Sequence, residues 1–419
     1  MISRNACYWI WITLSIGYNN PKVKRISEMY SDVSAFYYGG ISEWRLCGIF
    51  SQKDIERFSS TGLDDAKKIV DRCIECNYSI LCIDDELFPK CLYNIECPPA
   101  LIYVNGVMPD IDNTFSIGIV GTRRATKYGI ENFYRFAYAL SKYGTIIVSG
   151  GALGVDGASH RGALATDGIT ICVRGCGLNC SYLRENSDIR STIPKRGAVI
   201  TEYPPDETPR NYYFPARNRI IAALSDGLLV MEAGKKSGSL ITANLAAEQG
   251  KTIFALLGNN SPQNEGSNAL IKEGLAIPVT DFMDILCEFD SLYATTDDEF
   301  DIDNISLADT GNFPVKGIRK QAPARIYVNK QNDQPPAKTA VPYVSEKSET
   351  VVQKPVHKEN LNLPKTAQDV YEYIGNEPVH IDKISADLKI PVFKVLTALT
   401  MLEMKDLVSA LQGRNYILK

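Results

Sequence analysis

The sequence predicts an α/β protein in which a Rossmann-like parallel sheet is joined to an N-terminal helical module and a C-terminal winged-helix module. Short apolar runs alternate with helical patterns over residues 115–289, which is typical of a parallel sheet covered on both faces. Helical patterns followed by a hairpin pattern fill residues 361–419. The length of 419 residues, with 45% hydrophobic residues, allows two to four domains and at least one large core.

The first apolar stretch runs from Ala6 to Ile16. It is far shorter than the ~20 apolar residues that span a bilayer. It also lacks the basic start and the small-residue cleavage site of a signal peptide. We therefore expect a buried amphipathic helix, no membrane association and a cytoplasmic protein.

Six strands and four helices are predicted in the central segment. The strands are Phe115–Val120, Thr145–Ser149, Thr170–Val173, Ala198–Glu202, Gly227–Glu232 and Thr252–Leu257. The helices are Tyr128–Tyr143, Val155–Asp167, Pro215–Leu224 and Leu240–Gln249. Ligands of such sheets bind beyond the carboxyl ends of the strands, so the residues that follow each strand are the candidates for function.

Glycine and arginine are frequent at these positions. Glycine loops let backbone amides approach a phosphate, and guanidinium groups pair with phosphate oxygens and stack on bases. The arginines expected to converge at one sheet edge are Arg123, Arg124, Arg217 and Arg219. The rings Tyr212, Tyr213 and Phe214 offer stacking surfaces of the kind that single-stranded nucleic acid uses. Two alternatives remain: the arginines are solvated or paired with Asp156 and Glu232, and the rings belong to the core.

Other nucleotide chemistries lack their motifs. The GTRR turn after the first strand is not GxGxxG, and Leu245 occupies the first glycine position of an otherwise Walker-like run. His160, the only histidine of the sheet domain, lies in a predicted helix where a packed, a capping and an acid–base role are all compatible with the sequence. Of the eleven cysteines, only Cys73 and Cys76 have CxxC spacing. We expect no enzyme activity, no catalytic residue, no metal and no cofactor.

The central segment resembles the DNA-processing protein A family, also called DprA or Smf. The resemblance rests on collinear runs that include IVGTRRATKYG (119–129), IVSGGALGVDGASHRGAL (147–164), FPARNRIIAALSDGLLVMEA (214–233) and SGSLITANLAAEQGKTIFALLGNN (237–260). It implies a non-enzymatic protein that binds and protects incoming single-stranded DNA during natural transformation. It also implies that the protein loads the RecA recombinase onto this DNA and works as a homodimer.

The resemblance also implies a set of site residues. The family's DNA pocket maps onto Gly121, Thr122, Arg123, Gly150, Gly151, Arg217, Asn218 and Arg219. The following motif supplies Glu232, Ser237, Gly238 and Thr242, which we expect to shape the same pocket. Arg124, Phe214, Ser237, Gly238 and Thr242 complete the predicted DNA-binding set, and Asp156 and Glu232 are expected to shape the pocket. Asp156 is expected to cap a helix or to orient an arginine.

Five segments follow from composition and resemblance. Residues 1–75 are predicted to form a helical, SAM-like module, 76–114 an extended lead-in, 115–289 the DNA-binding domain, 290–360 a disordered linker and 361–419 the winged helix. In the last segment we expect helices at Thr366–Ile374, Ile381–Leu388 and Val392–Met404 and a hairpin through Leu407–Leu418. Charge is unevenly distributed along this acidic chain (−4): residues 115–289 carry +2, and residues 361–419 are neutral. The segment that is expected to bind nucleic acid is therefore positively charged.

A different class of function stays open beside DNA binding. Rossmann-like sheets with a glycine-rich second loop also occur in enzymes or sensors for nucleotide-derived small molecules, such as phosphoribohydrolases. Their GGxGT run corresponds here to SGSLIT (237–242), which lacks the double glycine.

Overall fold

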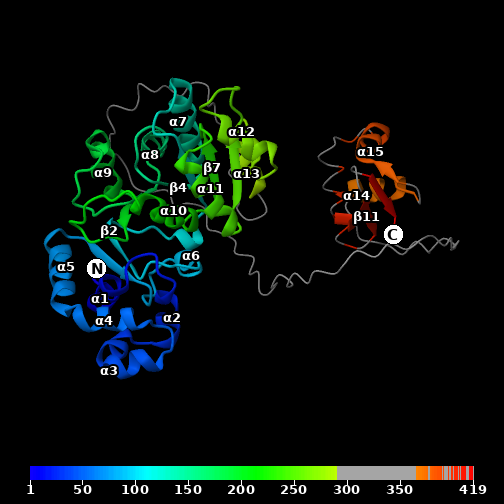
Figure 1. Cartoon of the computed structure of the whole chain (residues 1–419). Coiled ribbons are helices and arrows are strands. Elements are labelled where there is room, and N and C mark those ends of the chain that lie inside the picture. Colours follow the sequence, from blue (N-terminus) through cyan, green and yellow to red (C-terminus); the bar gives the residue numbers. More distant parts are fainter. Residues whose placement is uncertain are drawn as a thin grey trace. The chain divides into compact units, whose positions relative to one another are not determined.

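A nine-stranded sheet runs through the larger part of the chain in this computed structural model, which describes residues 1–289 and most of 365–418 (Figure 1). Its strands are β1 Ser79–Cys82, β2 Leu101–Gly106, β3 Ser116–Gly121, β4 Ile146–Ser149, β5 Thr170–Arg174, β6 Ala198–Thr201, β7 Gly227–Met231, β8 Thr252–Leu256 and β9 Ile277–Val279. Their order is β1-β2-β6-β5-β4-β3-β7-β8-β9. Strands β3 to β9 run parallel, whereas β2 is antiparallel to β6 and β1 is antiparallel to β2.

The six predicted strands correspond to β3–β8, but the prediction of a six-stranded sheet is wrong. Strands β1 and β2 come from the segment that was expected to be only an extended lead-in, and they extend the same sheet. The antiparallel pairing of β2 with β6 joins residues about a hundred positions apart, which local sequence patterns do not reveal. Strand β9 has three residues and contains Pro278. A proline is tolerated in a strand at the edge of a sheet, where β9 lies, but a strand this short with a proline gives no recognisable strand pattern in the sequence.

Helices cover both faces of this sheet. The helices that follow the strands are α7 Lys127–Lys142, α8 Val155–Ala165, α9 Ser187–Thr192, α10 Tyr213–Ala223, α11 Gly238–Glu248, α12 Glu265–Lys272 and α13 Phe282–Glu288. One core contains residues of α7, α8 and α13, and another contains residues of α10, α11 and α12. Strand β7 contributes to both, because Leu228 and Val230 lie in one core while Leu229 and Met231 lie in the other. This two-sided burial explains the continuous apolar strands of the sequence.

Five helices precede the sheet: α1 Ala6–Ile16, α2 Lys22–Met29, α3 Val33–Leu46, α4 Gln52–Ser60 and α5 Leu63–Glu75. Helix α1 is buried on nearly all sides rather than amphipathic, since Trp9, Ile10, Trp11 and Ile12 are all fully buried. Its side chains belong to the same hydrophobic cluster as residues of the sheet. None of the helices in the described part of the chain combines the length and apolar composition that crossing a bilayer requires.

Trp11 is the centre of an aromatic cluster at this end. Its ring centroid lies 5.0 Å from that of Phe58 and 5.7 Å from that of Trp44, and its indole nitrogen donates to the Thr61 carbonyl at 2.9 Å. We expect Trp11→Ala to lower the free energy of unfolding by about 3–5 kcal/mol, measured by urea denaturation. Leu46, which is 81% exposed, is the matched control, because Leu46→Ala should change stability by only about 0.5 kcal/mol. Equal effects of the two changes would contradict this packing.

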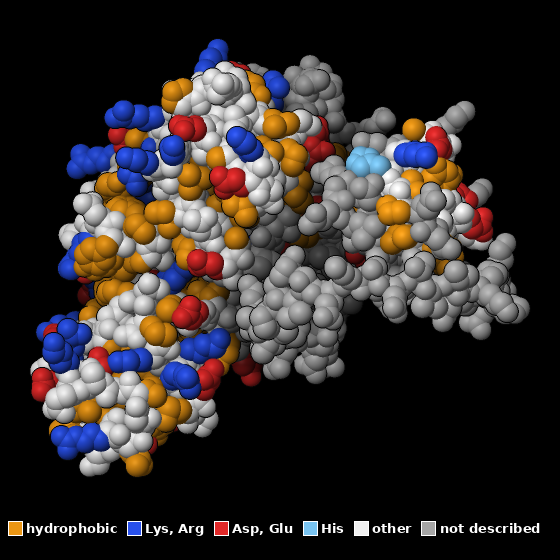
Figure 2. Space-filling model, turned by 45° about the vertical axis from the view of Figure 1, so that its right-hand side comes forward, with side chains coloured by type: hydrophobic (Ala, Val, Ile, Leu, Met, Phe, Trp, Pro, Cys, Tyr) orange, Lys and Arg blue, Asp and Glu red, His pale blue; other side chains and the backbone are white. Residues whose placement is uncertain are grey.

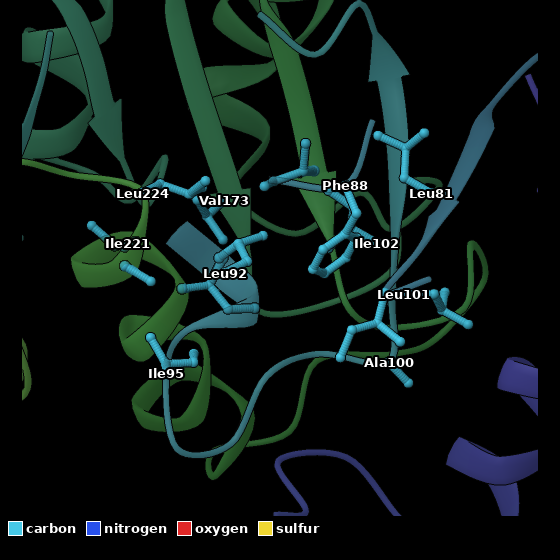
Figure 3. Close-up of a cluster of buried hydrophobic side chains, with 14 of the residues drawn as sticks. Leu81, Phe88, Leu92, Ile95, Ala100, Leu101, Ile102, Val173, Ile221 and Leu224 are labelled. Atoms are coloured by element: carbon cyan, nitrogen blue, oxygen red, sulfur yellow. The ribbon is translucent and has the colours of Figure 1, made fainter. Parts of the chain in front are cut away.

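The segment between β1 and β2 is fixed to the sheet by a second apolar group (Figure 3). It contains the short helix α6 Lys90–Tyr93. Phe88, Leu92 and Ile95 lie in one buried cluster with Ile221 and Leu224. Ile221 lies in α10 and Leu224 directly follows this helix. The segment between β1 and β2 therefore supports the helix that carries Arg217, Asn218 and Arg219.

The C-terminal part forms a separate unit, because the chain divides into Met1–Asp333 and Gln334–Lys419. Its described elements are α14 Lys365–Tyr373, β10 Val379–His380, α15 Ile381–Leu388, β11 Val408–Leu411 and β12 Asn415–Leu418. The strands form an antiparallel sheet in the order β10-β12-β11, as in a winged helix, and Val370, Ile384 and Leu402 lie in its core. The predicted linker and most of the predicted helix Val392–Met404 lie outside the described residues.

Candidate nucleic-acid interface

A pocket lies at the carboxyl ends of β4 and β5 and beside the loop that follows β3, where an α/β sheet is expected to bind its ligand. We call it the four-arginine pocket. Its lining residues are Arg123, Gly150, Gly151, Ala152, Cys172, Arg174, Gly175, Cys176, Tyr182, Leu183, Arg190, Phe214 and Arg217. Of the predicted DNA-binding set, Arg123, Gly150, Gly151, Phe214 and Arg217 therefore come together.

Arg217 forms the floor of the pocket. It lies in α10, its side chain is buried, and its Nη1 donates to the Gly150 carbonyl at 2.8 Å and to the Val173 carbonyl. These bonds connect α10 to the ends of β4 and β5. Burial lowers the pKa of the Arg217 guanidinium from its usual range, whereas the Asp156 carboxylate opposes that shift.

Asp156 lies beneath the glycine loop, in the first turn of α8. Its carboxylate accepts a hydrogen bond from the Ala152 amide at 3.2 Å. Burial raises its pKa, and the nearby Arg217 guanidinium acts in the opposite direction. A Cβ atom at Gly150 would lie 2.5 Å from Arg217 Nη1 and 2.7 Å from Asp156 Oδ2, so only glycine fits between these two side chains. The Asp156 carboxylate thus lies near the Arg217 guanidinium, and its role in orienting an arginine stays a prediction.

Arg123 and Phe214 form one wall. The Arg123 guanidinium lies 5.5 Å from the centroid of the Phe214 ring, within the range of a cation–π contact. The Phe214 ring also lies 5.4 Å from the ring of Tyr182. Gly175 makes room for this ring, since a Cβ there would lie 2.8 Å from Phe214 Cδ1. The half-buried Phe214 ring is therefore held at the pocket with an arginine beside it.

The loop that carries Arg123 is held by Glu232. The carboxylate of Glu232 accepts hydrogen bonds from the Thr126 amide at 2.8 Å and from the Thr126 hydroxyl. Thr126 in turn caps α7 by accepting from the Gly129 amide at 3.0 Å. A Cβ at Gly129 would lie 2.5 Å from the Glu232 carboxyl group. Among the described residues Glu232 pairs with this loop and with no arginine, so the predicted alternative of a Glu232–arginine ion pair is wrong.

Arg219 does not join the pocket, and the expectation that four predicted arginines converge is wrong. Its Nη2 forms a buried ion pair with Glu202 Oε1 at 2.7 Å, and its Nε donates to the Cys97 carbonyl at 2.9 Å. Residues two positions apart on a helix point in different directions, so Arg217 and Arg219 cannot share one ligand. Arg219 instead connects α10 to the segment before β2 and to the end of β6.

The remaining predicted residues lie at or near this sheet edge without lining the pocket. Arg124 is exposed, and Asn218 is half-buried. Gly121 ends β3, where a Cβ would lie 2.3 Å from the Met231 carbonyl, and Thr122 accepts from the Val155 amide through its carbonyl at 3.3 Å. Further along, Ser237 caps α11, Gly238 begins that helix, and Thr242 is buried within it. None of the residues of the SGSLIT run lines the pocket.

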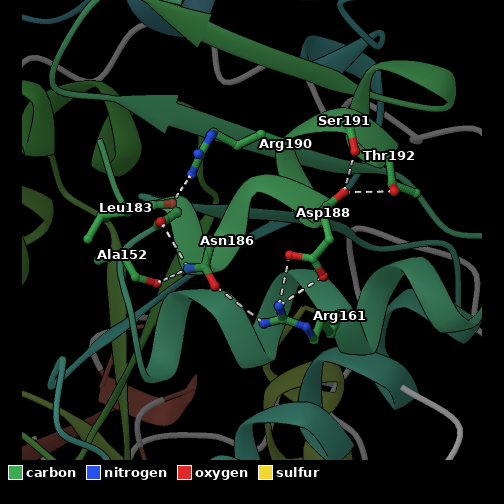
Figure 4. A network of polar contacts seen from close by, with 9 residues as sticks. Ala152, Arg161, Leu183, Asn186, Asp188, Arg190, Ser191 and Thr192 are labelled. Carbon is green, nitrogen blue, oxygen red and sulfur yellow. Dashed lines mark hydrogen bonds and ion pairs between the residues drawn. The ribbon is translucent and has the colours of Figure 1, made fainter. Parts of the chain in front are cut away.

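Two lining arginines were missed by the sequence analysis. Arg174 ends β5, and its guanidinium donates to the Leu178 and Cys180 carbonyls at 2.7 Å each. Its position at the end of a predicted strand could have identified Arg174 as a candidate site residue. Arg190 lies in α9 and donates to the Leu183 carbonyl at 2.6 Å (Figure 4). No local motif indicated it, because the chain brings it to the pocket from about 40 residues after the glycine loop.

A polar network holds the segment of Arg190 against the glycine loop (Figure 4). The side-chain amide of Asn186 donates to the Ala152 carbonyl at 2.8 Å and to the Gly151 carbonyl at 3.3 Å. Arg161 of α8 donates to Asp188 at 2.9 Å, which fixes α9 to α8. The network therefore sets the distance between the glycine loop and the wall that contains Arg190.

Positive charge is concentrated in the four-arginine pocket. None of its lining residues is acidic, and within the described chain no ion pair involves Arg123, Arg174, Arg190 or Arg217. By contrast, Figure 2 shows both signs of charge interspersed with hydrophobic side chains on the visible face. A local concentration of positive charge attracts an anion.

His160 is buried, its Nδ1 pairs with the Thr170 hydroxyl at 2.8 Å, and burial lowers its pKa to about 3. It is thus a neutral core residue. Among the residues with described positions, no group of three or more His, Cys, Asp or Glu side chains is placed to hold a metal ion.

Comparison with known proteins gives a consistent result. The family model for DNA recombination-mediator protein A matches residues 79–290, and that for the DprA winged helix domain matches residues 356–414. Protein Smf of Escherichia coli is 39% identical over 212 residues, which cover 50% of this chain and 56% of that protein. The DNA processing protein DprA of Bacillus subtilis is 39% identical over 193 residues, 46% of this chain and 65% of that protein.

A solved structure agrees with these sequence matches. The crystal structure of DNA processing protein A from Streptococcus pneumoniae has a TM-score of 0.58 and 30% identity to this chain, and it covers 66% of this chain and 95% of that one. The first family model alone spans just over half of the 419 residues.

Proposed function

Because the chain belongs to the DNA processing protein A family, we propose that it binds single-stranded DNA in the four-arginine pocket. We further propose that it protects incoming DNA during natural transformation, loads the RecA recombinase onto it and acts as a homodimer without enzymatic activity. The observation that carries the proposal is the meeting of four arginines, a glycine loop and the Phe214 ring at the ends of the strands.

The chemistry of the lining supports a single strand as the ligand. Guanidinium groups pair with phosphate oxygens at two points and stack on bases. The adjacent rings of Phe214 and Tyr182 offer flat surfaces to an unpaired base, which a duplex keeps inside its stack. His160 and Asp156 are both buried, and neither of them lines the pocket.

A gel shift with single- and double-stranded oligonucleotides tests the proposal. We expect the single strand to bind in preference to the duplex. On single-stranded DNA coated with a single-strand-binding protein, the chain should shorten the lag of RecA ATP hydrolysis. Binding of neither strand type would contradict the proposed function, and binding without an effect on RecA would contradict the loading role.

Phe214→Ala should weaken binding of oligo-dT by about 1–3 kcal/mol, the usual effect of removing one stacking ring. Fluorescence anisotropy measures this loss. The matched control is Tyr212→Ala, because Tyr212 is 61% exposed and does not line the pocket. Equal losses in the two variants would show that binding does not depend on the pocket wall.

A further inference from the structure

The four-arginine pocket holds more positive charge than one internucleotide phosphate requires. Its lining contains four guanidinium groups and no acidic residue. Asp156 lies below Arg217 and offsets part of one positive charge. A phosphodiester in a strand carries a single negative charge, whereas a phosphate monoester carries about −1.5 to −2 near neutral pH.

The four arginines fall into two pairs. Arg123 of the loop after β3 and Arg217 of α10 form one pair, and Arg174 at the end of β5 and Arg190 of α9 form the other. Within the part of the chain that the structure describes, the second pair is bonded only to uncharged partners: Arg174 donates to the Leu178 and Cys180 carbonyls and to the Cys176 sulfur, and Arg190 donates to the Leu183 carbonyl. Carbonyl groups satisfy hydrogen bonds but do not neutralise the charge.

Like charges in these pairs oppose each other. Burial lowers the pKa of the Arg190 guanidinium, and the charge of Arg174 lowers it further. At Arg217, burial again lowers the pKa and Arg123 adds a smaller effect in the same direction. An anion in the pocket relieves this repulsion, and a doubly charged one relieves more of it.

We propose that the four-arginine pocket selects a phosphate monoester over a phosphodiester, so that a strand bearing a terminal phosphate binds more tightly than an unmodified strand. This inference rests on the proposed DNA binding and names the part of the strand that the pocket takes. The same monoester chemistry occurs in a 5′-terminal phosphate, a 3′-terminal phosphate and a free nucleoside monophosphate.

Anisotropy titration of the full chain with oligo-dT of one length tests the preference. The strand is supplied unmodified, with a 5′-phosphate, with a 3′-phosphate, or with a 5′-methylphosphate, which is a diester with one charge. One terminal monoester should bind at least about tenfold tighter than the unmodified strand, the effect of one added charge-assisted hydrogen bond. The methylphosphate should give little of this gain.

Competition by a free nucleotide and comparison of the four strands distinguish which monoester binds and which of the two proposals fails. Competition by thymidine monophosphate at micromolar concentration assigns the free nucleotide as a ligand, and its failure to compete assigns the strand end; both support monoester selection. Equal affinity for all four strands overturns the inference and leaves the proposed function standing. Failure of every strand to bind contradicts the proposed function itself.

Arg190→Gln provides the test within the protein. The glutamine amide retains a donor for the Leu183 carbonyl but lacks the charge, so the affinity ratio between phosphorylated and unmodified strands should fall from at least about tenfold to near one. Arg190→Lys, which keeps the charge, should restore part of the ratio and serves if the first variant folds poorly. Arg184→Gln is the matched control, because Arg184 is exposed in the same segment and does not line the pocket. An unchanged ratio in Arg190→Gln overturns the inference.

Discussion

Arg123→Ala is expected to weaken binding of single-stranded oligo-dT by at least about tenfold while leaving the thermal unfolding midpoint unchanged. Arg123 is exposed, and in the described chain it contacts the Phe214 ring without pairing to a carboxylate. Its removal therefore costs little folding energy. If it neutralises one phosphate, the slope of log affinity against log salt should become less steep by about 0.7.

Arg124→Ala is the control for that result. Arg124 neighbours Arg123, carries the same charge and is exposed, but it does not line the pocket. We expect its affinity to stay close to that of the wild type. Equal losses in the two variants would indicate diffuse attraction by the loop. Arg217→Glu is a poorer test, since it would place a second carboxylate beside the buried Asp156 and so destabilise the fold.

Arg219→Ala is expected to lower the free energy of unfolding by about 3–5 kcal/mol, because it leaves Glu202 buried without its partner. Both side chains are almost fully buried, Glu202 Oε1 has only the Asn19 amide at 3.4 Å as a further donor, and Oε2 has no hydrogen-bond partner among the described residues. The variant also removes the bond from Arg219 Nε to the Cys97 carbonyl. Urea denaturation followed by circular dichroism measures this loss.

The double variant Arg219→Met with Glu202→Leu separates charge from packing. Replacing both members of a buried ion pair by apolar residues of similar size is often neutral or stabilising, so the double variant should recover most of the lost stability. If Arg219→Ala instead loses DNA affinity with no loss of stability, Arg219 belongs to the interface, as its sequence motif suggested.

The sequence predicted the parallel part of the sheet well because those strands are buried on both faces. Their apolar runs are continuous, and each of β3–β8 ends within one residue of the prediction. It missed β1, β2 and β9, whose assignment depends on pairing partners distant in the chain or on a strand interrupted by Pro278.

The site was predictable only in part. Glycine and arginine after parallel strands led to Arg123, Gly150 and Arg217, since topology brings strand ends together. The expected convergence of Arg219 is wrong because residues two positions apart on a helix do not face each other, so Arg217 and Arg219 point to different sides of α10. Arg190 could not be predicted from the sequence, because its place in the pocket depends on how α9 is held by Asn186 and Arg161.

Mapping of a photocrosslinked strand tests most directly whether single-stranded DNA lies in the four-arginine pocket. The full chain is irradiated with oligo-dT that contains 4-thiothymidine, and the crosslinked peptides are identified by mass spectrometry. We predict crosslinks to Phe214 or Tyr182, which are lost in competition with unlabelled single strand but not with duplex. Crosslinks confined to the C-terminal unit, or to α11, would contradict the assignment of the binding site.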